Sequence, residues 1–236
     1  MVKKTEAAVL FEINQPLRVI TLDIPPLKPG QVLVELAYSG ICASQLLEVK
    51  GKRGKDAFLP HTLGHEGSGG VLEIGPGVNK VKPGDKVVSS WLKGNGSDVS
   101  SVSYQSGDGI INSGAISTFI RHTVTCENRV TPIPQEMPLR EAALLGCAVP
   151  TGCGIIFNTA KMQAGDSVAV FGIGGVGLSS ILAANLVKAN PIIAIDIFDH
   201  KLEWARQGGA THLINAQKQD PLTEILNITE GKGVNY

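Results

Sequence analysis

The amino-acid sequence predicts an α/β protein in which a β-rich region precedes a doubly wound parallel sheet. Three observations lead to this prediction. Short β-rich runs bounded by Pro, Gly or Asn fill the first half of the chain. From Gly165 onward, strand-like and helix-like segments alternate with short connections. A glycine-rich turn separates the first of these strands from the helix that follows it, as in nucleotide-binding sheets.

The β-rich region contains five runs that we expect to be strands, and their length and turn-rich borders favour an all-β or α+β domain. They cover residues 7–13, 18–24, 31–40, 67–75 and 85–91. The polar stretch from Lys93 to Gly114 is rich in Gly and Ser, and we expect a long loop there that is either functional or mobile.

The pattern changes after Met137, where residues 138–161 carry apolar side chains at helical intervals. Pro150, Gly152 and Gly154 interrupt this stretch, so we expect a helix, a bend and a second helix. Such a change of pattern is typical of a junction between domains. We therefore predict a first domain over 1–150 and a second over 151–236.

The second domain is predicted as three strands that alternate with three helices. The strands are expected at 167–173, 191–196 and 211–215, and the helices at 176–188, 200–209 and 220–229. A sheet of three such strands leaves an apolar edge unpaired. We therefore expect the chain to be the front portion of a longer protein.

Residues 167–187 carry no charge and are long enough to suggest a membrane span, but four glycines interrupt them. A buried strand followed by a helix fits this stretch better.

Lys plus Arg and Asp plus Glu each total 21, so the chain has no net charge that would favour binding to nucleic acid or to an anionic membrane. A small, roughly neutral partner is expected. Four cysteines are too few for a disulfide scaffold, and the N-terminus has no apolar leader core, which indicates a cytoplasmic protein with reduced thiols.

The glycine-rich turn directly follows a predicted strand and opens a helix. Its residues are Gly172, Ile173, Gly174, Gly175, Val176 and Gly177. The glycines permit a tight turn and a close approach of a pyrophosphate to the helix N-terminus. Asp196 ends the next strand, where a carboxylate binds ribose hydroxyls and disfavours a 2′-phosphate, so NAD is predicted rather than NADP. The alternative is a glycine-rich turn in an α/β protein that binds no nucleotide.

A second set of residues is dispersed along the chain. Cys42, His65 and Cys147 together offer two thiolates and an imidazole, a donor set suited to zinc, and a catalytic zinc needs only three protein ligands and an open position. The alternative is that both cysteines are small buried residues and that the histidine forms a hydrogen bond within a turn.

Several motifs in sequence order resemble those of the zinc-containing medium-chain dehydrogenases, whose best-known members are the zinc alcohol dehydrogenases. They are Gly-Ile-Cys-x-Ser at 40–44, Gly-His-Glu at 64–66, GPGV at 75–78, KPGDKV at 82–87, Leu-Gly-Cys at 145–147 leading into Thr151-Gly152, and VFGIGGVGL at 170–178 with Asp196 downstream. The resemblance implies a GroES-like β domain, then an incomplete Rossmann domain, and a cleft between them. It also implies that the full-length protein forms a homo-oligomer.

On the metal side, the resemblance implies that Cys42, His65 and Cys147 bind one catalytic zinc. Glu66 matches a glutamate near the metal that enters its coordination in some states, and Ser44 matches the hydroxyl that contacts the substrate oxygen and starts the proton path. On the cofactor side, Thr151 matches a residue that packs near the nicotinamide. Lys201 matches one that helps to hold the adenosine ribose.

The chain also departs from this family pattern. The stretch from Lys93 to Ile116 has no cysteine, so no structural zinc is expected. Ala43, Gln45 and Leu47 occupy positions where many relatives have a basic residue, an aspartate and the terminal proton-relay histidine. We expect no chemical role for four further residues: Cys126 and Cys153 are assigned to packing, and His61 and His122 to structural or surface roles.

The predicted function is hydride transfer between an alcohol of primary, secondary or sugar type and NAD, in a zinc-dependent oxidoreductase with a small-molecule alcohol, aldehyde or ketone as substrate. One alternative is a truncated, non-catalytic chain that keeps the fold for binding or for assembly with a partner. Another is a zinc-free reductase of the same superfamily, against which the presence of all three candidate ligands argues.

Overall fold

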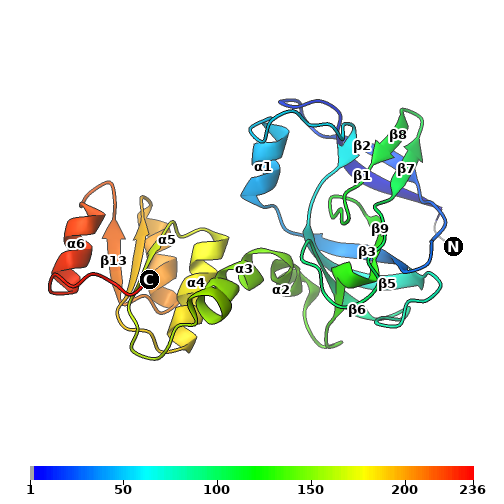
Figure 1. Ribbon diagram of the computed structural model, residues 1–236. Helices are drawn as coiled ribbons and strands as arrows, with labels where there is room; N and C mark the ends of the chain where they lie inside the picture. Colours follow the sequence, from blue (N-terminus) through cyan, green and yellow to red (C-terminus); the bar gives the residue numbers. More distant parts are fainter. Residues whose placement is uncertain (1–2) are drawn as a thin grey trace. The chain divides into compact units, whose positions relative to one another are not determined.

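A computed structural model describes residues 3–236, which form two compact units (Figure 1). The first unit ends at Cys147 and the second begins at Ala148. Each unit is described by itself below.

The first unit contains a closed barrel and a five-stranded sheet. The barrel order is β1 (Lys4–Leu10), β2 (Arg18–Asp23), β7 (Ser103–Ser106), β8 (Gly109–Asn112) and β4 (His61–Thr62). The sheet order is β10 (Val130–Pro132), β6 (Lys86–Ser90), β5 (Glu66–Ile74), β3 (Gln31–Ser39) and β9 (His122–Cys126). The helical segments of this unit are α1 (Ala43–Val49), α2 (Leu139–Ala142) and two 3₁₀ turns, η1 (Glu127–Arg129) and η2 (Ala143–Gly146).

The barrel core is filled by alternate residues of its strands. In β1, Ala7 and Val9 are buried, as the period of a strand with one buried face requires. Tyr104 of β7 and Ile111 of β8 are fully buried among them. The prediction of one long loop over 93–114 was therefore wrong: residues 103–112 form a hairpin whose two large side chains complete the barrel core.

The rest of that predicted loop is held by a buried carboxylate. Glu127 accepts hydrogen bonds from the backbone N–H groups of Asn79 at 2.6 Å, Lys80 at 2.7 Å and Ser97 at 2.9 Å. Burial alone would raise the pKa of Glu127, but these donors outweigh it and hold the pKa below its ordinary value. One side chain thus joins two loops of the first unit.

The second unit is a three-stranded parallel sheet in the order β11 (Val168–Phe171), β12 (Ile192–Asp196), β13 (His212–Asn215). Its helices are α3 (Ala148–Gly154), the π-helix η3 (Ile155–Ala160), α4 (Gly175–Leu186), α5 (Asp199–Gln207) and α6 (Pro221–Ile228). The three strands and the three helices that follow them lie where the sequence predicts them. The sheet backbone continues beyond β11, since Ala169 N–H donates to the Tyr236 carbonyl at 3.0 Å.

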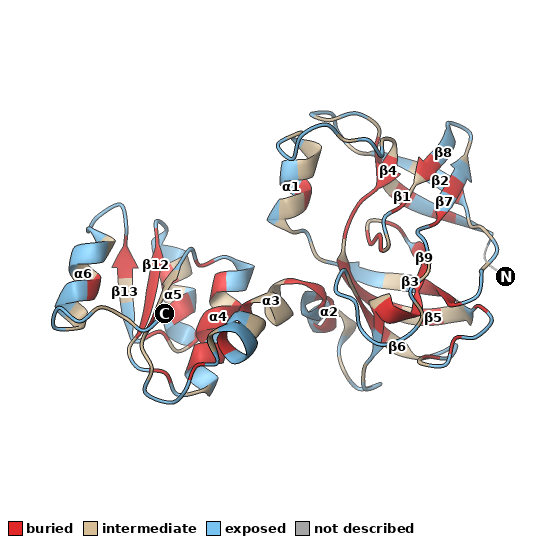
Figure 2. Ribbon diagram, viewed as in Figure 1, coloured by how far each residue is buried: buried red, intermediate tan, exposed pale blue. Residues whose placement is uncertain are grey.

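Both faces of this sheet are covered, which explains why β12 has four apolar residues in succession before Asp196 and is buried throughout in Figure 2. Ile192 and Ala194 pack in the same core as Ile181 of α4. Ile193 and Ile195 point to the opposite face, where they pack with Ile225 of α6 and neighbouring apolar residues. Helices on both faces of a parallel sheet define a doubly wound arrangement.

Residues 167–187, the stretch of spanning length, divide into β11 and the 12-residue helix α4. Within residues 3–236, no single helix has both the length and the apolar character needed to cross a membrane. Two segments that meet at a bend, Leu139–Gly146 and Ala148–Ala160, reach that length and composition only together.

Candidate functional site

Three residues that are far apart in the sequence meet in the first unit. Cys42 precedes α1, His65 precedes β5, and Cys147 follows η2. One ligand atom from each of the three lies within 4.8 Å of the other two, and Nε2 of His65 is 3.2 Å from Sγ of Cys147. The fold therefore brings together the three candidate zinc ligands.

Two glycines beside the cysteines make this convergence possible. A Cβ atom at Gly146 would lie 2.7 Å from Cβ of Glu66, and one at Gly40 would lie 2.6 Å from the Glu66 carboxyl carbon. Any larger residue at either position would displace the buried Glu66. The glycines of the Gly-Ile-Cys and Leu-Gly-Cys motifs thus leave the space in which Glu66 packs close to Cys42 and Cys147.

Burial and neighbouring charges shift the pKa values of two residues in the cluster. Burial, followed by the negative charges of Glu66 and Cys42, raises the pKa of the Cys147 thiol to about 11. Burial, with a smaller effect of the Arg53 charge, lowers the pKa of His65, which keeps its imidazole neutral. Bonds of about 2.3 Å to sulfur and about 2.0 Å to nitrogen place the ligand atoms of a tetrahedral zinc roughly 3.5 Å apart. The spacing and the donor set therefore fit zinc.

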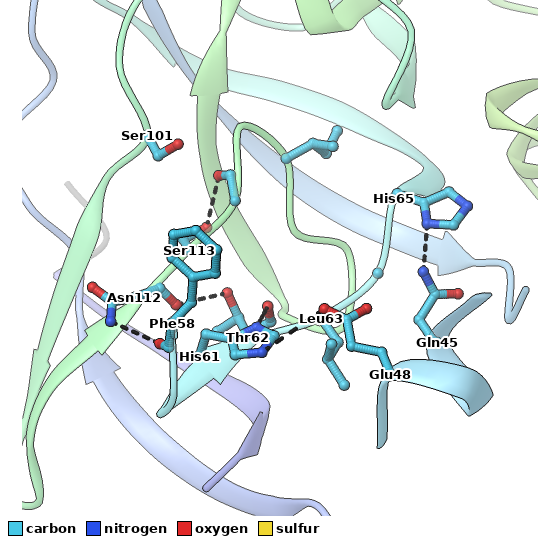
Figure 3. Close-up of a pocket in the computed structure, with 13 residues that line it drawn as sticks. Gln45, Glu48, Phe58, His61, Thr62, Leu63, His65, Ser101, Asn112 and Ser113 are labelled. Carbon is cyan, nitrogen blue, oxygen red and sulfur yellow. Dashed lines mark hydrogen bonds and ion pairs between the residues drawn. The ribbon is translucent and has the colours of Figure 1, made fainter. Parts of the chain in front are cut away.

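Two side chains at the start of α1 follow Cys42 closely in the chain. Ser44 Oγ is buried and has no hydrogen-bond partner among residues 3–236. Gln45 is buried, and its Oε1 accepts a hydrogen bond from the Cys42 N–H at 2.9 Å. Nε2 of Gln45 lies against Nδ1 of His65 (Figure 3). Sequence reasoning identified Gln45 only as a departure from the family pattern and missed its contacts with two candidate ligands.

A cavity of about 350 Å³ opens on the His65 side of this cluster (Figure 3). A volume of this size falls at the lower end of the range for small-molecule sites. Its lining includes Gln45, Phe58, His61, His65, Ser113 and Ile116.

A second cluster on the same cavity wall was not expected from the sequence. Nε2 of His61 lies 2.9 Å from a carboxylate oxygen of Asp56 and 3.9 Å from one of Glu48, and Nδ1 lies 3.0 Å from the Thr62 carbonyl. Burial would raise the pKa of Asp56, but hydrogen bonds from Phe58 N–H and His61 outweigh it and lower that pKa. This cluster ties α1 and the loop after it to β4.

In the second unit, the glycine-rich turn has the geometry that the sequence predicts. Gly172 has a φ of 88°, a conformation that L side chains rarely adopt. A Cβ atom at Gly177 would lie 2.1 Å from the Gly172 carbonyl oxygen, so this position requires glycine. Gly174 has nothing within 4 Å of its Cβ position, which leaves room for a ligand, and no side chain caps the helix that follows.

Asp196 lies at the end of β12 beside this turn. Its Oδ2 accepts a hydrogen bond from Ile173 N–H at 2.7 Å, and its Oδ1 accepts one from Phe198 N–H at 3.0 Å. Lys201 Nζ lies 3.7 Å from Oδ2. Burial would raise the pKa of Asp196, but these donors and the Lys201 charge outweigh it and lower the pKa. Asp196 is therefore a carboxylate at neutral pH.

A hollow of about 320 Å³ lies over this carboxylate, and Asp196 and Lys201 both line it. Thr151, the remaining predicted cofactor residue, lies half-buried in α3. That helix packs closely against α4, since a Cβ at Gly152 would lie 2.3 Å from the Val176 carbonyl oxygen.

A β-rich unit with a Cys-His-Cys cluster, followed by a unit with a nucleotide-type turn, defines the class of two-domain dehydrogenases. Family comparisons agree with this class. Residues 28–135 match the alcohol dehydrogenase GroES-like domain, and residues 175–236 match the zinc-binding dehydrogenase model.

Two S-(hydroxymethyl)glutathione dehydrogenases are similar to this protein. The one from Synechocystis sp. is 36% identical, and the match covers 99% of this chain and 70% of the relative. The one from Photobacterium damsela subsp. piscicida is 37% identical, and the match covers 94% of this chain and 67% of the relative. Among solved structures, the benzyl alcohol dehydrogenase of Acinetobacter calcoaceticus has a TM-score of 0.87 and 33% identity over 99% of this chain and 69% of its own. An alcohol dehydrogenase zinc-binding domain protein of Burkholderia ambifaria has a TM-score of 0.90 and 30% identity over 99% of this chain and 69% of its own.

The chain belongs to the zinc-containing medium-chain alcohol dehydrogenase family. It is an oxidoreductase of that family, and its relatives act on small molecules. The prediction of a GroES-like domain followed by a Rossmann-like region is confirmed. The chain spans about 70% of the length of the Synechocystis relative.

Proposed function

We propose that this protein is a zinc-dependent dehydrogenase that transfers hydride between an alcohol and NAD. The observation that carries the proposal is the convergence of Cys42, His65 and Cys147 on one point beside a cavity. In this proposal the three residues hold one zinc ion, and Glu66 lies next to it. Zinc supplies a Lewis acid for the alcohol oxygen, and NAD supplies the hydride acceptor.

Ser44 is proposed to receive the proton of the alcohol. A buried hydroxyl without a partner can both accept and donate a hydrogen bond, so its Oγ is free to bind the substrate oxygen. Leu47 cannot pass a proton onward, because its side chain is apolar. The proton that Ser44 receives must therefore reach solvent by a route that does not pass through residue 47.

The second unit is proposed to hold NAD. The open space at Gly174 and the free N–H groups at the start of α4 suit a pyrophosphate. The ionised Asp196 can accept hydrogen bonds from the ribose hydroxyls and repels a 2′-phosphate, while Lys201 lies beside it. We assign Thr151 to a position near the nicotinamide by its match to the family motif alone.

The substrate is proposed as an alcohol of primary, secondary or sugar type, with the aldehyde or ketone as its product. The relatives' names refer to S-(hydroxymethyl)glutathione and benzyl alcohol, which supports the alcohol class without selecting one compound. We further propose a homo-oligomer in the full-length protein and a cytoplasmic location. The four unpaired cysteines are compatible with a reducing compartment.

Metal analysis and turnover test this function. The purified chain should hold about one zinc, and Cys147→Ser should lose both the zinc and the reduction of NAD by an alcohol panel. Cys153→Ser, which changes a half-buried cysteine of the other unit, is the matched control and should keep both. A metal-free wild type that is indifferent to substitution of Cys42, His65 and Cys147 would instead support a non-catalytic chain.

A further inference from the structure

Gln45 contacts two of the three proposed metal ligands. Its Oε1 accepts a hydrogen bond from the Cys42 N–H at 2.9 Å, and its Nε2 contacts His65 Nδ1, as the dashed line in Figure 3 shows. Gln45 is 5% exposed as a whole residue, so water competes little for these contacts. The direction of each hydrogen bond therefore depends on the chemistry of the groups themselves.

The backbone fixes the orientation of the Gln45 amide. A peptide N–H can only donate, so the amide oxygen must face Cys42 and the NH₂ group must face His65. An amide NH₂ also only donates, which requires a lone pair on Nδ1 of His65. The proton of the neutral ring then resides on Nε2, which lies 3.2 Å from Sγ of Cys147.

Metal binding needs the opposite arrangement. A neutral histidine that coordinates a cation through Nε2 carries its proton on Nδ1 and donates it to an acceptor. Gln45 presents a donor at that point. We propose that Gln45 is a positioning residue that holds His65 with its proton on Nε2, so that metal entry requires the Gln45 amide to turn over and release the Cys42 N–H.

This inference rests on the proposed zinc site and predicts that the chain binds the metal less tightly than it would with a hydrogen-bond acceptor facing His65 Nδ1. Glutamate has the shape of glutamine but offers two acceptor oxygens. At position 45 it would accept from the Cys42 N–H and from a proton on His65 Nδ1 at the same time. Gln45→Glu should therefore lower the zinc dissociation constant by about 10- to 100-fold, the size of effect that partners of metal ligands have.

The test uses the full chain and zinc in competition with a chromophoric chelator. Leu46→Glu is the matched control, because it adds the same charge at the adjacent position, where the side chain is 53% exposed. It should change the dissociation constant less than about twofold, since exposed charges are well screened. Equal zinc affinities for wild type and Gln45→Glu, or equal gains in both variants, would overturn the proposal.

Two further measurements separate this inference from the proposed function. Saturating cobalt in place of zinc should give thiolate-to-metal absorption in wild type and in Gln45→Glu, and its absence from both proteins would reject the metal site itself. Nitrogen-15 NMR of the metal-free wild type reads the His65 tautomer directly and needs no metal. A proton on Nε2 in wild type, and a shift toward Nδ1 in Gln45→Glu, supports the role of Gln45, whereas a proton on Nδ1 in wild type rejects it.

Discussion

The Asp196 carboxylate accepts a 2.7 Å hydrogen bond from the Ile173 N–H, 23 residues earlier in the chain. The residue proposed to bind ribose therefore also anchors the glycine-rich turn proposed to bind the pyrophosphate. A carboxylate has lone pairs for further donors, so both roles are compatible. The turn and the acidic residue act as one structural unit.

Replacing Asp196 should therefore affect both stability and cofactor binding. In the native protein, the N–H groups of Ile173 and Phe198 each donate to a different oxygen of the Asp196 carboxylate. Asp196→Asn removes the negative charge and leaves one side-chain oxygen for these two donors. We expect a loss of about 1–3 kcal/mol in the free energy of unfolding and at least about tenfold weaker NAD binding. Denaturant unfolding and calorimetric titration measure the two effects. Asp199→Asn, at an exposed carboxylate, should change neither strongly.

Gly146→Ala should damage the metal centre without altering any proposed ligand. The added Cβ would lie 2.6 Å from the Ser89 carbonyl oxygen and 2.7 Å from Cβ of Glu66, so Cys147 must shift. Overpacking of this kind costs about 1–3 kcal/mol, and zinc content should fall. Gly70→Ala in β5 meets nothing within 4 Å and serves as the control. A Gly146→Ala protein with full zinc content would show that Glu66 packing does not position Cys147.

Sequence patterns were sufficient to predict the three strands of the second unit and the helices that follow them. Strands buried on both faces appear as short apolar runs, and the short connections to the helices mark where each element ends. The approach of Cys42, His65 and Cys147 was also predictable, since each lies in a glycine-containing motif of known order. Contacts such as that of Gln45 with His65 depend on segments that meet only in the fold. No element was predicted at strand β9, a short segment in which three of the five residues are His or Thr. All five residues are buried, so the polar ones do not mark a solvent-exposed face.

The hairpin of β7 and β8 was missed for a different reason. Its Ser, Gly and Asp residues are typical of a loop, and only two apolar side chains, Tyr104 and Ile111, are fully buried. Tyr104 contributes more than apolar area, since its hydroxyl accepts a 2.9 Å hydrogen bond from the Val124 N–H. β9 is the last strand in its sheet, and this bond satisfies an N–H group that lacks a strand partner.

Tyr104→Phe should consequently destabilise the first unit although it keeps the ring. The Val124 N–H would remain buried without an acceptor, at a cost of about 1–3 kcal/mol in the free energy of unfolding. Tyr38→Phe, at a side chain that is 47% exposed, is the control and should cost less than about 0.5 kcal/mol. Chemical denaturation followed by fluorescence would measure both variants, and equal midpoints would contradict the role of the Tyr104 hydroxyl.

The Glu127 carboxylate should make part of the stability depend on pH. Its pKa is lower in the folded protein than its ordinary value of 4.5, because three backbone N–H groups stabilise the charged form against the opposing effect of burial. The folded state therefore binds this proton less readily than the unfolded state. Its stabilisation is complete above about pH 4.5 and is lost as the pH falls through the lower, folded pKa.

Glu127→Gln places an NH₂ group opposite a backbone N–H, so it should lower the free energy of unfolding at pH 7 by about 1–3 kcal/mol. The difference between wild type and Glu127→Gln should narrow as the pH falls below 4.5, where the carboxylate becomes protonated first in the unfolded chain and then, at the lower folded pKa, in the native protein. Denaturant unfolding from pH 7 to pH 3 measures this difference, with Glu136→Gln at an exposed position as the control. A difference that stays constant over this range would mean that the charge of Glu127 does not hold the two loops together.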